Sequence, residues 1–136
     1  MKFGKQMNKE ERKQNINEWI ESYKNKKWFN PQPELDKAIE SFNKNDLDKS
    51  SEHLIKLNER YLTYIYDRFE EFIKNLHIPS DTDLERNIKK RFSEHKHSRM
   101  VRYKVISLLR NAIKLNKLDL NDEEKWIIEE YGGEYT

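Results

Sequence analysis

Apolar residues recur at intervals of three and four along most of this 136-residue chain. An α-helix places residues at that spacing on one face, because it completes a turn every 3.6 residues. The first such set is Ile16, Trp19, Ile20 and Tyr23. Only two valines, three glycines and three prolines are present, whereas β-sheets favour β-branched residues and use glycine in turns. The sequence therefore predicts an all-α fold.

Capping residues and prolines mark the ends of the expected helices. At three places an Asn or Thr is followed three residues later by Glu, which is typical of a helix start. These start signals are Asn8-x-x-Glu11, Thr82-x-x-Glu85 and Asn121-x-x-Glu124. Pro31 and Pro33 separate two early helices, Pro79 ends a long one, and a further helix begins near Ser98. The chain is thereby divided into about five to six helices.

The longest expected helix follows a cap at Asn45 or Asp46 and covers roughly 30 residues. Its apolar residues form two rows of heptad-like spacing. The rows are Leu47, Leu54 and Tyr61, and Ile55, Leu62, Phe69 and Leu76. We therefore expect one long central helix with a wide apolar face turned toward the others.

The composition favours one folded domain. Leu, Ile, Val and Phe make up 32 of the 136 residues, about 24%, whereas disordered chains fall below about 20%. A chain of this length can bury roughly 68% of its unfolded surface. We predict a compact single-domain helical bundle over residues 1–136, with a flexible basic segment at 1–7 and a flexible tail at 132–136.

Several classes of site and location are disfavoured by the sequence. Cysteine is absent, which excludes disulfides, thiolate zinc sites and a cysteine nucleophile. Phosphate-binding glycine loops, Gly-x-Ser-x-Gly elbows and His-Glu-x-x-His motifs are also absent. No apolar run approaches the ~18 residues of a membrane span. We expect a cytoplasmic protein without a cofactor, a metal site or a membrane segment.

Charge is segregated along the chain, although the net charge is only +2. Residues 86–117 contain eleven basic side chains and one acidic side chain, Glu94, so this stretch carries 11 − 1 = +10. Residues 118–136 contain one basic and seven acidic side chains, which gives −6. A basic stretch of this kind is typical of a surface that binds polyanions.

The basic stretch predicts contacts with RNA or DNA phosphates. On the helix from about Ser98, the cations share one side and Val101, Val105, Leu108, Ala112 and Leu115 share the other. Tyr103 and Phe92 could stack on bases. The candidate nucleic-acid-binding residues are Lys89, Lys90, Lys96, Arg99, Arg102, Arg110, Lys114 and Lys117. Two alternatives remain open: a solvated surface neutralised by neighbouring acidic helices, and a surface for an acidic protein partner.

Two histidines lie at the junction of the fourth and fifth expected helices. The local sequence is Arg91-Phe92-Ser93-Glu94-His95-Lys96-His97. A histidine here could transfer protons near neutral pH. An arginine could hold a phosphate and stabilise the charge that develops during phosphodiester cleavage. Together they indicate a candidate site for metal-free ribonuclease chemistry.

The spacing Arg91-x5-His97 resembles the Arg-x4–6-His motif of the HEPN family of small helical bundles. The stretch from Ala38 to Leu54 is similar to that family's early helix–turn–helix. The family includes metal-independent ribonucleases of toxin–antitoxin and phage-defence systems, which act as dimers. The resemblance implies that Arg91 and His97 form a catalytic pair and that the chain forms a homodimer. Phe92 stands where the family often has a polar residue.

Three functional hypotheses follow from these patterns. The first is a small binding or regulatory protein that associates with RNA or DNA through residues 86–117. The second is a protein–protein inhibitor, such as an immunity protein, an antitoxin or a phage-encoded inhibitor. The third is a HEPN-like ribonuclease that uses Arg91 and His97. We rank a binding role above an enzymatic one. Between the two binding roles we favour nucleic acid, because charge segregation is the one feature that exceeds ordinary folding needs.

Overall fold

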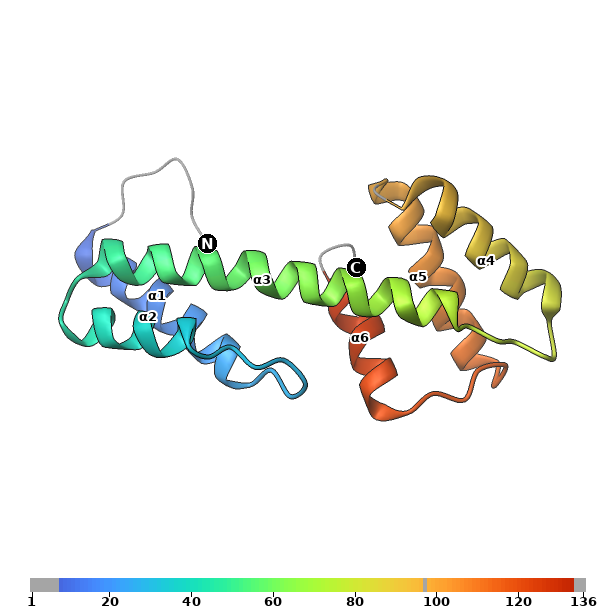
Figure 1. The fold of residues 1–136 in the computed structure, drawn as a ribbon, viewed down its shortest axis with the longest axis horizontal. Coiled ribbons are helices and arrows are strands. Elements are labelled where there is room, and N and C mark those ends of the chain that lie inside the picture. The colour runs from blue at the N-terminus through green and yellow to red at the C-terminus, as the bar shows by residue number, and fades with distance from the viewer. Residues whose placement is uncertain (1–7, 97, 134–136) are drawn as a thin grey trace. The chain divides into compact units, whose positions relative to one another are not determined.

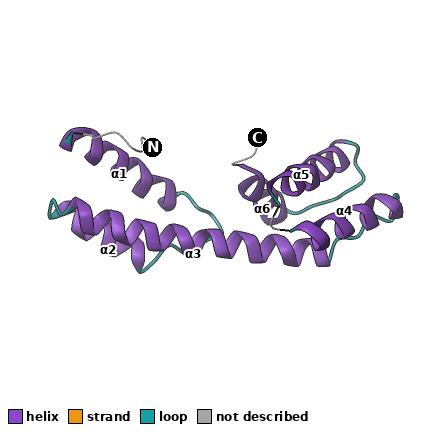
Figure 2. Cartoon of the chain, turned by 90° about the horizontal axis from the view of Figure 1, so that it is seen from above, coloured by secondary structure: helices purple, strands orange, loops and turns teal. Residues whose placement is uncertain are grey.

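A computed structural model describes residues 8–96 and 98–133. Within those ranges 77% of residues are helical and no strand occurs, which confirms the all-α prediction (Figures 1 and 2). The six helices are α1 (Lys9–Lys24), α2 (Glu34–Asn43), α3 (Leu47–Lys74), α4 (Thr82–His95), α5 (Arg99–Lys114) and α6 (Asp122–Gly132). The expected long helix is therefore α3, with 28 residues.

The contacts between residues group the chain into two compact units. The N-terminal unit comprises residues 1–64 and the C-terminal unit comprises residues 65–136. The boundary falls inside α3, which supplies residues to both units. The prediction that the whole chain forms one domain stays a prediction.

In the N-terminal unit, α1 packs against α2 and against the first part of α3. The Tyr23 hydroxyl of α1 donates a 2.7 Å hydrogen bond to Oδ1 of Asn58 in α3. Ser50 of α3 is fully buried, and its Oγ donates to the Ala38 carbonyl oxygen of α2 at 2.8 Å. The buried apolar residues of this unit are Ile16, Ile20, Tyr23, Phe29, Leu35, Ala38, Leu47, Leu54, Leu57 and Tyr61.

The turn between α2 and α3 is closed by backbone hydrogen bonds. The Asp46 N–H donates to the Ser41 carbonyl oxygen at 2.9 Å, and the Asn45 N–H donates to that of Phe42 at 3.0 Å. This pattern is a Schellman motif, which needs a left-handed residue at its centre. Asn45 occupies that position with φ 64°. Asp46 then caps α3, because its Oδ1 accepts from the Lys49 N–H at 3.2 Å.

In the C-terminal unit, α5 packs against α4 and α6. The rings of Phe69 in α3 and Tyr131 in α6 stack in parallel, with centroids 3.8 Å apart. The other buried apolar residues are Ile65, Ile73, Leu76, Ile78, Ile88, Phe92, Val105, Ile106, Leu109, Ala112, Ile127 and Ile128. Gly132, which was expected in a flexible tail, is buried in the last turn of α6. Residues 1–7 and 134–136, the other residues expected to be flexible apart from Gly133, lie outside the described residues.

The predicted caps of α1 and α6 are confirmed, whereas that of α4 is wrong. Asn8 and Asn121 each accept a 2.8 Å hydrogen bond from the backbone N–H three residues later. At α4 the cap is Asp81, whose carboxylate accepts from the Leu84 N–H at 3.0 Å. Glu85 accepts instead from the Ile78 N–H, at 2.6 Å. Its carboxylate therefore fixes the connection between α3 and α4 rather than a capping box with Thr82.

The apolar rows predicted for α3 are only partly buried. Ile55 and Leu62 are 51% and 47% exposed, although both were expected in the core. Leu57, Ile65 and Ile73 are buried in α3. The buried face of α3 is therefore narrower than the face on which its apolar residues lie.

Candidate nucleic-acid interface

The helix α5 carries the densest part of the predicted basic surface. It contains five basic residues and no acidic residue. Val105, Ile106, Leu109 and Ala112 form its buried face, whereas Leu115, which was expected in the core, is 55% exposed. At 100° per residue, the buried stripe is rotated by about 70° from the predicted one. Some of the cations therefore lie beside the core instead of pointing directly into solvent.

Arg102 and Arg110 are two cations of α5 that contact other residues of their own unit. The Arg102 guanidinium lies 5.4 Å from the centroid of the Tyr131 ring and 6.0 Å from that of Tyr66, within the range of cation–π attraction. Arg110 donates from Nε and Nη2 to the two carboxylate oxygens of Glu129, at 3.3 and 3.2 Å. Both side chains thus hold α5 to its own unit.

Three further candidates form ion pairs with acidic residues of the same unit. The Lys96 Nζ lies 3.1 Å from Oε2 of Glu70, and its pKa is raised chiefly by that hydrogen bond. The other two pairs are Lys117–Asp81 (3.0 Å) and Lys89–Glu85 (3.8 Å). For these three positions and Arg110, the surface is neutralised by acidic neighbours. This was one of the two alternatives that the sequence left open.

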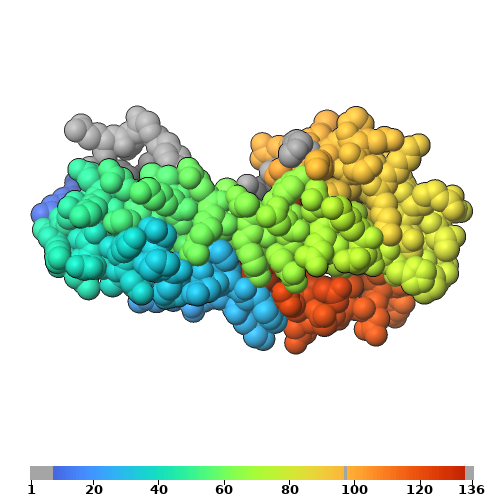
Figure 3. Space-filling model, in the orientation of Figure 1, coloured from blue at the N-terminus to red at the C-terminus, as the bar shows by residue number. Residues whose placement is uncertain are grey.

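The remaining candidates lie on the solvent side of the α4–α5 hairpin. Lys90 and Lys114 are exposed and form no ion pair with any residue of 8–96 or 98–133. Arg99 is exposed at the start of α5. The space-filling view shows α4 in yellow and α5 in orange as a continuous surface (Figure 3). Fewer exposed cations therefore lie on this surface than the charge count suggested.

Sequence reasoning missed Lys104 and Met100 on this face. Lys104 is exposed and has no ion pair among the described residues, and Met100 is 77% exposed. Tyr103, next to Lys104 in the sequence, is 55% exposed, as a stacking residue must be. Phe92 is only 4% exposed and contacts Phe69, so the expectation that it stacks on bases is wrong. A helical projection of α5 with its buried residues at the centre of the core side places Lys104 and Met100 on the exposed side.

A shallow hollow on α4 continues the basic surface. It is lined by Thr82, Glu85, Arg86, Lys89, Lys90 and Ser93. The Arg86 Nη1 is 3.4 Å from Oδ1 of Asp83, and both side chains are largely exposed. Exposed ion pairs of this kind contribute little to stability, so Arg86 remains available to an anionic ligand.

Only one residue of the candidate catalytic pair, Arg91, is among the described residues. Arg91 is exposed on α4, and its Nε donates to Oδ1 of Asn87 at 2.9 Å. His97 lies outside the described residues, so the Arg91–His97 pair stays a prediction. His95 ends α4 and is exposed.

The two other histidines pair with glutamates. Nδ1 of His53 lies 3.2 Å from Glu34, and Nδ1 of His77 lies 3.0 Å from Glu85. The described ranges contain no cluster of three or more His, Asp or Glu side chains able to hold a metal ion. Their helices also include none long and apolar enough to cross a membrane.

Comparison with protein-family models, with curated proteins and with solved structures finds no match to this chain. The resemblance to the HEPN family therefore gains no support from these comparisons. A function must be inferred from the chain's own residues.

Proposed function

We propose that this chain is a small regulatory protein that binds single-stranded nucleic acid through the solvent face of its α4–α5 hairpin. The observation that carries the proposal is that α5 has no acidic residue and exposes three of its five cations, Arg99, Lys104 and Lys114, together with Tyr103. Cations with an accessible aromatic ring suit a single strand, whose phosphates need neutralising and whose bases can stack.

The exposed residues of α5 lie on one side of the helix, where a single ligand can contact them together. At 100° per residue, Arg99, Tyr103 and Lys114 fall within about 60° of one another. Met100 and Lys104 extend the same face by about 80°. Since α5 has 16 residues, this face is about 24 Å long, enough for several nucleotides.

The first turn of α5 adds to the positive potential. The other five helices each have at least one acidic residue in the first turn, but α5 has none. Cations near a helix N-terminus are unfavourable, because the positive end of the macrodipole lies there. A bound phosphate would offset that repulsion between Arg99, Arg102 and the helix terminus.

The test is a titration of the purified protein against labelled single-stranded RNA at several salt concentrations. Binding should weaken steeply with salt, and the double variant Lys104→Ala/Lys114→Ala should reduce the slope by about 0.7 for each phosphate that is no longer neutralised. The control is Lys49→Ala/Lys56→Ala, which removes two exposed lysines of α3 in the N-terminal unit. Absence of binding at low salt would refute the proposal, as would equal effects of the two double variants.

Tyr103 provides a second, salt-independent test. Loss of one base–aromatic stack costs about 1–3 kcal/mol, so Tyr103→Ala should weaken binding by roughly 5- to 150-fold. Tyr103→Phe keeps the ring and should bind nearly as well as the wild type. Equal loss in both variants would exclude stacking on this ring.

The two remaining hypotheses can be separated in the same experiments. Shortening of the RNA, abolished in His97→Ala, would support the ribonuclease hypothesis. The inhibitor hypothesis is favoured by exposed Ile55 and Leu62, which lie seven residues apart on one side of α3. If RNA does not bind, a protein that docks on these two side chains is the next candidate partner.

A further inference from the structure

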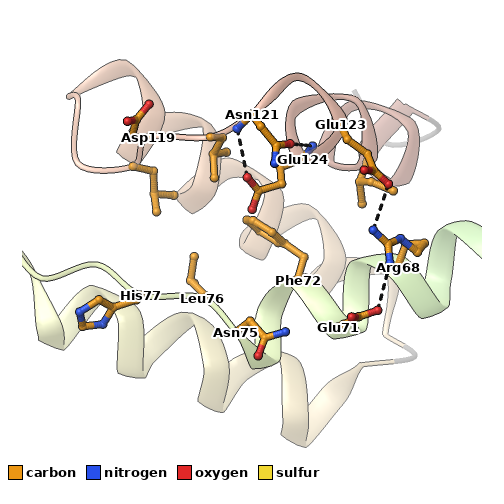
Figure 4. A pocket seen from close by; sticks show the side chains of 13 residues that line it. Arg68, Glu71, Phe72, Asn75, Leu76, His77, Asp119, Asn121, Glu123 and Glu124 are labelled. Atoms are coloured by element: carbon orange, nitrogen blue, oxygen red, sulfur yellow. Dashed lines mark hydrogen bonds and ion pairs between the residues drawn. The ribbon is translucent and has the colours of Figure 1, made fainter. Parts of the chain in front are cut away.

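A cavity of about 370 Å³ opens in the C-terminal unit, and none of its lining residues belongs to the basic stretch 86–117 (Figure 4). It is formed by the last turns of α3, by the segment that joins α5 to α6, and by the start of α6. Leu76 and Ile127 line it and are only 4% and 3% exposed. Phe72, Leu118 and Leu120 complete its apolar wall. Binding sites for small molecules usually have volumes of about 300–1,000 Å³, so this cavity could hold a small one.

The charged side chains that line the cavity are mostly anionic. They comprise four carboxylates and one guanidinium, which give a formal charge of 1 − 4 = −3 when His77 is not counted. These charged residues are Glu71, Asp119, Glu123, Glu124 and Arg68. Nη1 of Arg68 lies 3.2 Å from Glu71, and Nη2 lies 3.0 Å from Glu123. The single arginine is thus shared between two carboxylates, and a phosphate or carboxylate ligand would be repelled.

Two of the carboxylates can face a ligand without losing an ionic partner. Glu124 accepts from the Asn121 N–H through Oε1 at 3.0 Å, which fixes its side chain in the capping box of α6. In the view of Figure 4 its carboxylate points toward the Phe72 ring. Asp119 is exposed at the rim and forms no ion pair within the described part of the chain.

We propose that this cavity binds a small organic ammonium ion, that is, a protonated amine joined to an apolar ring or short chain. The apolar part would contact Leu76, Ile127 and Phe72. The ammonium group would lie near Glu124 and Asp119, and a cation beside an aromatic ring gains a further attraction. This inference does not depend on nucleic-acid binding, because the cavity and the basic surface share no residue.

The experiment is a titration of the intact chain with 2-phenylethylamine, followed by the methyl resonances of Leu76 and Ile127 in NMR spectra. The neutral analogue 2-phenylethanol and the anionic analogue 3-phenylpropionate serve as comparison probes. The amine should bind about tenfold more tightly than the alcohol, because two carboxylates and an aromatic ring favour the cation. The anion should not bind in the millimolar range.

Three variants separate a specific site from general electrostatic attraction. Glu124→Gln keeps a side chain that can form the capping box but removes the charge, and Asp119→Asn removes the charge at the rim. Each should weaken amine binding about three- to fivefold and leave alcohol binding unchanged. Glu94→Gln, which removes an exposed charge on α4 in the same unit, is the matched control and should have no effect.

Three results would overturn the proposal. The amine and the alcohol could bind equally, Glu94→Gln could weaken the amine as much as the cavity variants do, or the Leu76 and Ile127 resonances could remain unshifted. RNA binding is measured separately, so failure here would leave the proposed function standing.

Discussion

Gly132 closes the contact between α6 and α5 where no larger side chain fits. A Cβ atom at this position would lie 2.9 Å from Cγ2 and 3.2 Å from Cγ1 of Ile106, and 3.4 Å from Nη2 of Arg110. Ile106 is only 2% exposed, and a β-branched side chain in a helix has few alternative rotamers. Replacing Gly132 by alanine must therefore displace one helix slightly from the other.

Two opposing effects determine the size of this change. Alanine is more favourable than glycine in a helix by up to about 1 kcal/mol, and the gain is smaller at the last helical residue. Overpacking a buried contact costs typically about 1–3 kcal/mol. The overpacking term is larger, so we expect Gly132→Ala to lower the free energy of unfolding by about 1–2 kcal/mol.

Urea denaturation followed by circular dichroism measures this difference. Gly133→Ala is the control, because a Cβ at Gly133 meets nothing within 4 Å and its φ of −58° suits alanine. A double-mutant cycle with Ile106→Ala isolates the contact, since Gly132→Ala should cost less once the Ile106 methyl groups are gone. The reasoning is refuted if Gly132→Ala is as stable as Gly133→Ala, or if its cost is the same in both backgrounds.

Other substitutions test the remaining parts of the structure. Leu54→Ala should cost about 2–5 kcal/mol because Leu54 is fully buried, whereas Ile55→Ala at a half-exposed position should cost less than about 1 kcal/mol; equal urea midpoints would contradict this. Asn45 has φ 64°, so in thermal unfolding Asn45→Gly should be more stable than Asn45→Ala by about 1 kcal/mol, and the reverse order would be inconsistent with the turn. The pKa of Glu85 is lowered chiefly by the hydrogen bond from the Ile78 N–H. Its charge therefore stabilises the fold above the unfolded pKa, and this contribution is lost as pH falls through the folded pKa. Urea midpoints of wild type and Glu85→Gln should accordingly converge in acid, and a gap that is constant across pH would exclude this role.

Sequence patterns predicted the helices well where the signals are local. The caps at Asn8 and Asn121 depend on residues within one turn, and spacing alone finds them. At α4 both Asp81 and Thr82 could cap, and the choice is set by Glu85, which bonds the Ile78 N–H instead. The backbone around Pro79 brings those two groups together, and no helical pattern describes that path.

The candidate surface was harder to predict because its cations have distant partners. Arg110 pairs with Glu129 and Arg102 lies over Tyr131, about 19 and 29 residues further along the chain. A charge count cannot distinguish such residues from Lys104, which stays in solvent. The cavity lined by residues 68–77 and 118–127 was missed for the same reason, since its two walls are separated in sequence.

The position of the unit boundary inside α3 has a consequence for how the chain unfolds. An isolated helix shorter than about 12–15 residues is only marginally stable in water, so residues 65–74 of α3 depend on packing within the C-terminal unit. Loss of structure in the N-terminal unit would leave residues 65–74 with a frayed helix end and four unsatisfied backbone N–H groups. Hydrogen exchange in that segment should therefore respond to a destabilising substitution in either unit, because neither unit can release α3 without cost to the other.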